Sequence, residues 1–80
     1  MLLQFTDLFK RGTHQLTATI TTEHSLSSYG QPVLLLSDGK PIDATSWVLM
    51  GYSVLKMSKK EAPLMEKWLG NLNLMLGGAV

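Results

Sequence analysis

The sequence contains no cysteine among its 80 residues. Disulfide bridges and thiolate metal sites are therefore excluded, and with them the class of small disulfide-rich secreted proteins. Only two histidines are present, His14 and His24, and no further ligand stands at a spacing typical of a metal site. We expect a cytoplasmic protein that holds no metal and no other cofactor.

Charged residues are also scarce. They make up 16% of the chain and leave a net charge of +1, against a charged fraction of roughly 25% in typical soluble domains. This balance is not that of a strongly basic nucleic-acid binder, although it leaves room for a local basic patch. No apolar run reaches the about 18 residues of a membrane-spanning helix, and Asp7 interrupts an apolar start that lacks the features of a signal peptide. We expect no contact with a membrane.

Apolar residues, by contrast, are abundant at 45% of the chain. A domain of this length buries only about 60% of the surface that its unfolded chain exposes. Part of the apolar surplus must therefore lie on the surface or in an interface. We expect a homodimer, because two-fold dimers are the commonest oligomers, and a single domain that spans residues 1–80.

The clearest strand spans residues 13–22. His14, Leu16, Ala18 and Ile20 alternate there with polar residues, most of them threonine. This period of two predicts a strand with one buried face. A threonine-rich outer face is ordinary for a strand, and it is also a face that could enter a DNA groove as part of a ribbon.

A hairpin is predicted directly after Gly30. Residues 33–37 are apolar on both faces, which predicts a central strand. Asp38-Gly39 predicts a type I′ turn, in which both central residues need positive φ. The return over residues 40–43 contains Pro41, which cannot donate to a ladder and therefore predicts the edge of a sheet.

Three segments leave alternatives open or predict little regular structure. Residues 2–10 carry apolar side chains close to helical spacing, which favours a helix, although Leu3 and Phe5 alternate as they would in a short strand. Residues 23–29 predict one short helical turn. Residues 52–57 are compatible with a strand or with the continuation of a helix.

A short helix is predicted over residues 47–50. Asp43, Thr45 or Ser46 can cap its N-terminus, and Gly51 can end it. Together with the strands and the longer helix described next, it predicts an α+β fold. In that fold a small antiparallel sheet of about three strands, including the Asp-Gly hairpin, packs against two or three helices.

The C-terminal helix has the strongest start signal in the chain. Ser58-Lys59-Lys60-Glu61 is a capping box, in which Ser58 and Glu61 satisfy each other's backbone amides. Either the helix kinks at Pro63 or its regular part begins near that residue, and Gly77-Gly78 predicts its end. Its broad apolar face is formed by Leu64, Met65, Trp68, Leu69, Leu72, Met75 and Leu76.

No set of residues predicts catalysis. Glu23-His24-Ser25 contains an acid, a base and a nucleophile, but neighbours in sequence do not in general face one another, and a triad is defined by geometry. The aspartates and glutamates are each explained as turn, cap or surface residues, and the glycines lack the spacing of a phosphate-binding loop. We expect no enzyme, no catalytic residue and no small-molecule substrate.

The lysines near the last helix are the candidate DNA-binding residues. They are Lys56, Lys59, Lys60 and Lys67. Lys59 and Lys60 would lie near the helix N-terminus, where phosphate groups are attracted. The alternative is an ordinary solvated helix face, because Glu61 and Glu66 are interleaved with these lysines.

The same helix also supplies the candidate residues for a dimer or partner interface. They are Trp68, Leu72, Met75 and Leu76. Tryptophan and methionine are favoured at interfaces, and the helix is more apolar than a simple two-layer domain requires. The alternative is that these side chains fill the core of the monomer.

The segment Gly30-Gln31-Pro32-Val33-Leu34-Leu35-Leu36-Ser37-Asp38-Gly39-Lys40-Pro41-Ile42-Asp43 resembles the hairpin of the Phd/YefM antitoxin family. In that family a G-x-P-V strand is followed by G-K-P and a hydrophobic residue on the return. The resemblance implies a dimeric DNA-binding domain that represses its own operon, together with a toxin-binding C-terminal segment. It covers residues 30–43 and, more loosely, the strand that precedes them.

Two functional hypotheses follow. The first is a small dimeric transcription regulator of prokaryotic, phage or plasmid type that binds DNA through the lysines. The second is a protein-binding module or an inhibitor of a host protein that uses the apolar face of the last helix. The first predicts binding that weakens steeply with salt, and the second predicts little dependence on salt.

Overall fold

The computed structural model describes residues 1–7, 9, 11–27 and 29–75. In chain order its elements are β1 (Leu2–Thr6), β2 (Thr13–Thr21), β3 (Val33–Leu36), α1 (Ala44–Leu49), β4 (Ser53–Lys56) and α2 (Ala62–Met75). The strands form one antiparallel sheet in the order β3-β2-β1-β4. The predicted α+β fold is confirmed, with four strands in place of about three and with two helices in the described residues.

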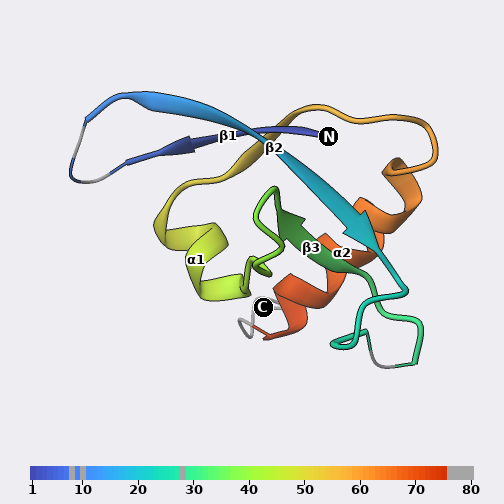
Figure 1. The fold of residues 1–80 in the computed structure, drawn as a ribbon. Helices are drawn as coiled ribbons and strands as arrows, with labels where there is room; N and C mark the ends of the chain where they lie inside the picture. The colour runs from blue at the N-terminus through green and yellow to red at the C-terminus, as the bar shows by residue number, and fades with distance from the viewer. Residues whose placement is uncertain (8, 10, 28, 76–80) are drawn as a thin grey trace.

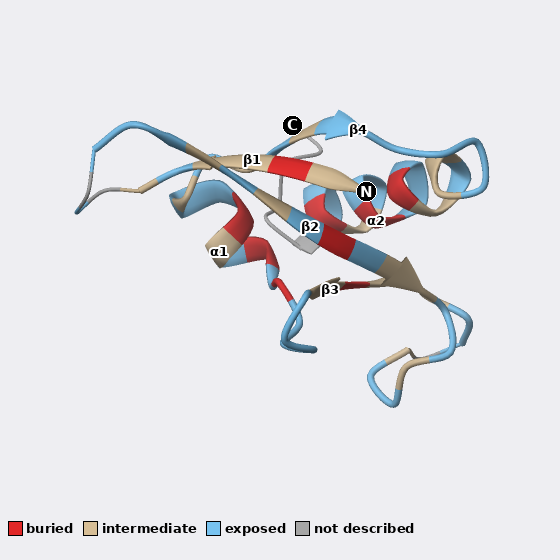
Figure 2. Ribbon diagram, turned by 45° about the horizontal axis from the view of Figure 1, so that its top comes forward, coloured by how far each residue is buried: buried red, intermediate tan, exposed pale blue. Residues whose placement is uncertain are grey.

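Both helices lie on one side of the sheet (Figure 1). The buried residues of the strands and helices face one another across this interface (Figure 2). The core consists of Leu3, Ala18, Leu34, Ile42, Ala44, Trp47, Met65, Trp68 and Leu72. The opposite face of the sheet carries no helix in the described structure, so it is open to solvent.

The prediction of β2 is confirmed, and its alternation decides which face is buried. Ala18 is 1% exposed, and Leu16 and Ile20 pack against the core on the same side. The alternate residues, among them Gln15 and Thr17, are exposed. The period of two is visible in the sequence because one face of this strand meets the helices and the other meets water.

The preferred helix over residues 2–10 is wrong, and the strand alternative is correct. Leu3 is fully buried and pairs with Leu16 of β2 on one side and Val54 of β4 on the other. Pairing on both edges determines the conformation here, whereas the helical spacing of the apolar residues was accidental. The chain then turns back into β2 through Arg11 and Gly12, whose φ angles are 48° and 98°.

The Asp-Gly hairpin forms, but not with the predicted type I′ turn. Gly39 has a φ of 87°, whereas Asp38 does not have a positive φ. The Gly39 amide donates to the Leu36 carbonyl at 2.9 Å, and the Leu36 amide donates to the Lys40 carbonyl at 2.8 Å. These bonds define a three-residue loop in which a type I turn is followed by a left-handed glycine, the second common way to close a hairpin.

The return of the hairpin is a single bridge rather than a strand. Pro41 pairs with Leu35 only as an isolated bridge, and the Ile42 amide donates to the Leu34 carbonyl at 2.8 Å. The expected edge position of Pro41 is confirmed. β3 ends the order of the four strands, but its other edge is paired with the return segment through the Pro41 bridge and the bonds at Lys40 and Ile42, so the expected central position holds only in this limited sense.

The short helix α1 (Ala44–Leu49) follows the capping rules. Asp43 is the N-cap of α1, and its side chain accepts a hydrogen bond from the Ser46 amide at 2.7 Å. Gly51, with a φ of 59°, follows the end of α1.

The open question over residues 52–57 is decided in favour of a strand, β4. Residues 23–29 contain a turn closed by a bond from the Ser27 amide to the His24 carbonyl at 2.8 Å.

The predicted capping box is present. The Ser58 amide donates to Oε1 of Glu61 at 2.8 Å, and the Glu61 amide donates to Oγ of Ser58 at 3.2 Å. The helix α2 begins at Ala62, so Pro63 lies in its first turn, where a missing amide proton leaves no bond unmade. The predicted helix end at Gly77-Gly78 lies outside the described residues.

Candidate nucleic-acid interface

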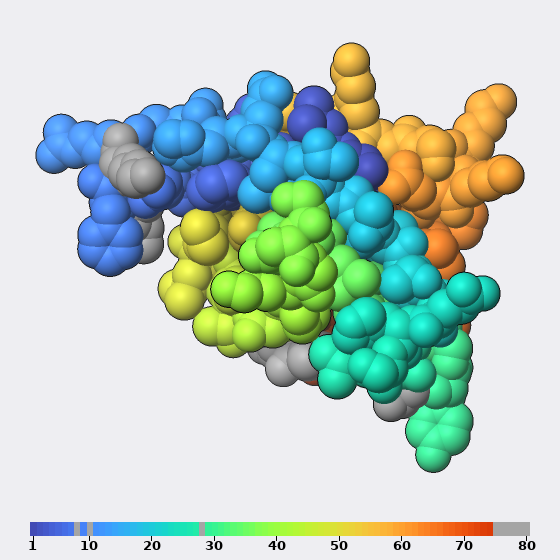
Figure 3. Space-filling view, in the orientation of Figure 1, coloured from blue at the N-terminus to red at the C-terminus, as the bar shows by residue number. Residues whose placement is uncertain are grey.

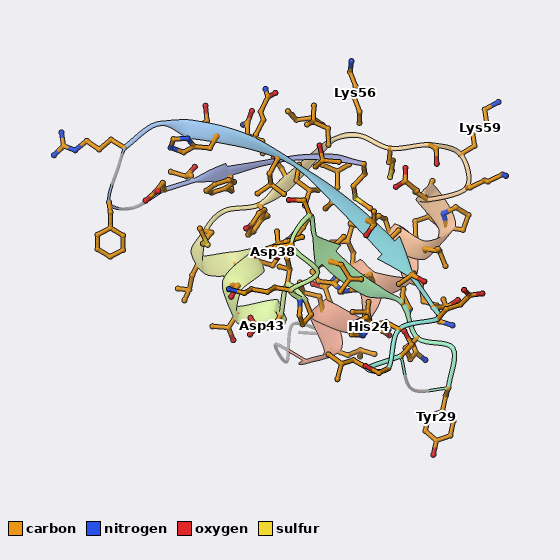
Figure 4. All side chains as sticks on the ribbon, viewed as in Figure 1. His24, Tyr29, Asp38, Asp43, Lys56 and Lys59 are labelled. Carbon is orange, nitrogen blue, oxygen red and sulfur yellow. The ribbon has the colours of Figure 1, made fainter. Side chains whose placement is uncertain are left out.

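Three of the predicted lysines lie at one corner of the molecule, which we call the lysine corner: Lys56, Lys59 and Lys60. Lys56 is the last residue of β4, and the other two lie in the turn that leads into α2. All three are exposed. Lys56 and Lys59 point away from the body of the protein (Figure 4), and the segment that carries them runs along the upper edge of the surface (Figure 3).

The backbone of the lysine corner is held from two sides. On one side Lys56 pairs with Leu2 in the β1–β4 ladder, next to an irregularity of register. On the other side the Ser58–Glu61 capping box fixes the turn before α2. The lysines therefore extend from a fixed backbone, although their own long side chains are free to adjust to a ligand.

The acid nearest to the corner in sequence is Glu61, and both of its oxygens are occupied. Oε1 accepts from the Ser58 amide at 2.8 Å, and Oε2 accepts from the amino group of Met1 at 3.0 Å. The hydrogen bond from the Ser58 amide, and after it the bond from the amino group of Met1, hold the pKa of Glu61 below its ordinary value. The charge of Glu61 is thus compensated by an amino group and not by a lysine. Within the described residues, none of the three corner lysines forms an ion pair.

The fourth predicted lysine, Lys67, lies apart from the corner. It is exposed in the second turn of α2, about 8 Å along the helix axis from the first residue of that helix. Its neighbour in sequence, Glu66, is exposed as well. Lys56, Lys59 and Lys60 therefore share one short exposed segment, whereas Lys67 lies on α2 beside an acid.

Sequence reasoning missed a second polar feature, a pair of glutamines on the open face of the sheet. Gln4 of β1 lies directly opposite Gln15 of β2. Gln15 is exposed and Gln4 is half-buried. The threonine alternation of residues 13–22 already indicated an exposed face, but the partner of Gln15 could not be found while residues 2–10 were assigned to a helix.

The four predicted interface residues have different positions. Trp68 and Leu72 are each 8% exposed and belong to the core, where the Trp68 ring packs edge-on against Trp47 with centroids 4.9 Å apart. Met75 is the last residue of α2, but its side chain, like the whole of Leu76, lies outside what the structure describes.

An apolar groove of about 560 Å³ lies between α2 and the β3 hairpin. Trp68 and Leu72 form part of one wall, and Val33 and Ile42 form part of the other. Exposed Leu26 lies at its rim. Two polar residues of the lining, Asn71 and Gln31, are joined by a hydrogen bond from Nδ2 of Asn71 to Oε1 of Gln31 at 2.6 Å.

A single charged group lines the described part of this groove, the carboxylate of Asp43. The hydrogen bond from the Ser46 amide lowers the pKa of Asp43, so the group is anionic at neutral pH. The groove therefore combines an apolar surface with one negative charge.

The sequence triplet Glu23-His24-Ser25 does not form a catalytic arrangement. Nδ1 of His24 accepts a hydrogen bond from the Leu26 amide at 3.1 Å, which makes His24 part of the turn (Figure 4). The Glu23 amide donates to Oγ1 of Thr21 at 3.0 Å. The absence of an enzyme activity stays a prediction, and these two contacts are those of a loop.

Comparisons of the chain with protein-family models, with curated proteins and with solved structures found no match. In the part of the chain that the structure describes, no helix has the length and apolar character needed to cross a membrane. Nor do three histidine, aspartate or glutamate side chains gather there in a group that could hold a metal ion. The function has to be inferred from the surfaces.

Proposed function

We propose that this protein is a small, non-enzymatic DNA-binding protein of the transcription-regulator kind, which contacts DNA phosphates through the lysine corner. The observation that carries the proposal is the gathering of three exposed lysines, none of them in an ion pair within the described residues, on a chain with a net charge of only +1. A lysine is a mobile point charge with three donors, and it suits phosphate contacts that do not depend on sequence.

The distribution of charge supports the same conclusion. Asp43 lies on the side of the molecule away from Lys56 and Lys59 (Figure 4), and the nearby acid Glu61 is paired with the amino group of Met1. Because the net charge is small, the attraction for a polyanion is confined to the corner, and the protein is oriented as it approaches the duplex. Dimerisation would place two such corners on one duplex, as in regulators that bind paired half-sites.

The test is a fluorescence-anisotropy titration of a labelled duplex from directly upstream of the coding sequence, at low and at physiological salt. The variant replaces Lys56, Lys59 and Lys60 together by alanine, and the matched control is Lys40→Ala, an exposed lysine on the β3 hairpin. We expect the wild type and Lys40→Ala to bind alike and the triple variant to lose most of its affinity. Binding that survives in the triple variant, or an absence of binding in the wild type, would contradict the proposal.

The groove supports a second candidate function, the binding of a protein partner. Its lining is apolar apart from Asp43 and the Gln31–Asn71 bond. Charge complementarity then identifies the partner as an apolar segment that carries a cationic residue opposite Asp43, for example one face of an amphipathic basic helix. This candidate uses the distal end of α2, whereas DNA binding uses the region before its N-terminus.

The second candidate is tested by titration with two amphipathic helical peptides, one of leucine and lysine and one of leucine and glutamate. Trp68 lines the groove, so the tryptophan fluorescence reports occupancy. We expect the leucine–lysine peptide alone to change the emission, and Leu26→Asp to abolish the change. The control is Leu49→Asp, an equally exposed leucine on α1 outside the groove. An equal response to both peptides, or no response, would exclude this candidate.

A further inference from the structure

The open face of the β1–β2 hairpin presents side chains of the kind that contact base edges. Along β2 the outward residues are Thr13, Gln15, Thr17 and Thr19, all of them exposed. Along β1 they are Leu2, Gln4 and Thr6, because these residues lie opposite Thr17, Gln15 and Thr13 in turn. Apart from Leu2, the face thus consists of amide and hydroxyl groups with small methyl groups between them, and none of these residues carries a charge.

The hydrogen-bond pattern places the outward side chains in close pairs. Met1 and Ala18 exchange two bonds, from the Ala18 amide to the Met1 carbonyl at 2.9 Å and from the Met1 amino group to the Ala18 carbonyl at 2.8 Å. In an antiparallel ladder, hydrogen-bonded pairs alternate with non-hydrogen-bonded pairs, whose side chains are closer. Counting from Met1, the pair of Gln4 and Gln15 is a non-hydrogen-bonded pair, so the two side chains leave the sheet close together.

Within the described residues, β3 does not pair with Thr13–Thr17 of β2, so that edge of the face is open. The hairpin is two strands wide at Phe5 and Thr6, whereas β4 adds a third strand beside β1 as far as Gln4. Beyond Gln4 the hairpin continues as a ribbon that extends past the body of the protein (Figure 1).

The inner side of the ribbon is anchored. The Phe5 ring packs against the rings of His14 and Tyr52 at centroid distances of 5.4 and 5.3 Å. The Thr6 amide donates to the Met50 carbonyl at 2.8 Å. These contacts hold the ribbon against α1 and β4, so its outer face is presented as a fixed surface.

Dimensions and chemistry both match the major groove of B-DNA. That groove, about 12 Å wide, admits a two-stranded ribbon, and β1 and β2 can enter it with the open edge of β2 foremost while β4 stays at the border. Outward residues on one strand repeat every 6.8 Å or so, which is about two base-pair steps. A glutamine amide can make a bidentate contact with N6 and N7 of adenine, and a threonine methyl can contact the thymine methyl.

Lys56 lies on the same side of the sheet as this face. It pairs with Leu2, which in turn lies opposite Thr17 on the outer face, and its side chain rises from the side of the sheet that the helices do not cover (Figure 4). With the ribbon in the groove, the lysine corner would reach the phosphates that border it.

We propose, on the basis of the DNA-binding function above, that the Gln4–Gln15 pair with Thr13 and Thr17 reads A·T base pairs in the major groove. In this arrangement the lysine corner supplies affinity for any duplex, and the glutamine pair supplies the preference for one sequence. Gln15, as the more exposed amide of the pair, makes the principal base contact.

The test begins with selection of a duplex from a pool with a randomised core by the wild-type protein. The ratio of its affinity to that of a scrambled duplex is then measured for the wild type, for Gln15→Ala and for Asn73→Ala, an exposed amide on α2 that serves as control. In a parallel series the adenines of the selected duplex are replaced by 7-deazaadenine, which lacks the N7 acceptor. Gln4→Ala provides a second variant, and circular dichroism verifies the fold of each.

We expect the selected duplex to be rich in A·T pairs. Gln15→Ala should lower the affinity ratio by about tenfold, and 7-deazaadenine should lower it to a similar degree for the wild type but not further for Gln15→Ala. An unchanged ratio in Gln15→Ala and Gln4→Ala would overturn the inference, as would equal binding to an RNA duplex, whose major groove is too narrow for side chains.

Two outcomes separate this inference from the function on which it rests. If the pool yields no preferred sequence while binding still depends on salt and on the lysine corner, base reading is wrong and phosphate binding stands. If the wild type binds no duplex at all, the proposed function fails and the inference fails with it.

Discussion

Glu61 and the amino group of Met1 join the last helix to the first strand. Oε2 of Glu61 accepts from this amino group at 3.0 Å, while Oε1 accepts from the Ser58 amide at 2.8 Å. The same amino group donates to the Ala18 carbonyl of β2. One carboxylate therefore links the start of α2 to the middle of the sheet, and this link fixes the lysine corner relative to the open face of the β1–β2 hairpin.

Replacing Ser58 by alanine should destabilise the fold. The hydroxyl of Ser58 accepts from the Glu61 amide, and loss of such a cap lowers stability by about 1 kcal/mol. Urea unfolding of Ser58→Ala, compared with Ser53→Ala on the exposed side of β4, measures the effect. An equal stability of the two variants would show that the capping box does not contribute.

The stability of the protein should fall as the solution becomes acidic, in part through Glu61 and Asp43. The pKa of each is lowered in the folded state, for Glu61 first by the Ser58 amide and for Asp43 first by the Ser46 amide. The folded state therefore binds fewer protons than the unfolded one. The stabilisation is complete above the ordinary pKa of about 4 for these groups, and it is lost as the pH falls through the lower values of the folded state.

The combined variant Glu61→Gln, Asp43→Asn tests this account. It should be less stable than the wild type at neutral pH, and its stability should change less between about pH 5 and pH 2, because two of the titrating groups are gone. Denaturant titrations at a series of pH values measure both quantities. An unchanged dependence on pH would show that the acid sensitivity arises at other carboxylates.

Trp68→Ala should unfold the protein or nearly so. Trp68 is 8% exposed and packs against Trp47, and truncation of a buried tryptophan lowers stability by about 3–5 kcal/mol. For a chain of this length that is a large part of a total of roughly 4–12 kcal/mol. The comparison variant is Leu69→Ala, because the side chain of Leu69 is 36% exposed. Near-equal thermal unfolding temperatures of the two variants would place Trp68 outside the core.

Gly39→Ala should weaken the hairpin through backbone strain alone. The φ of Gly39 is 87°, and an added Cβ would meet no heavy atom within 4 Å. A residue with a side chain in the left-handed region costs roughly 1–2 kcal/mol, and asparagine should cost less than alanine, because it tolerates that region. The two variants are compared by thermal unfolding. A loss with asparagine as large as the loss with alanine would contradict this explanation.

The parts of the fold that the sequence predicts well are those with local causes. The capping box from Ser58 to Glu61 and the cap at Asp43 depend on side chains within three residues of their partners. The strand through Ala18 is visible because its two faces meet different surroundings. Such features need no knowledge of the rest of the molecule.

The errors have long-range causes. Leu3 is a strand residue because two other strands pair on either side of it, and within residues 2–10 the alternation of Leu3 and Phe5 was the weaker signal beside the apparent helical spacing. The glutamine pair depends on the same register and was missed for the same reason. The lysines were visible as a sequence cluster, but only the turn before α2 shows that Lys56 lies with Lys59 and Lys60 while Lys67 stands apart.

The central claim is that the lysine corner binds DNA phosphates, and the most direct test is the dependence of the binding constant on salt. The logarithm of the binding constant is plotted against the logarithm of salt concentration for the wild type and for the variant with Lys56, Lys59 and Lys60 replaced by alanine. Each phosphate contact contributes about 0.9 to the slope, so the variant should show a slope shallower by about 2.7. Equal slopes for the two proteins would contradict the claim.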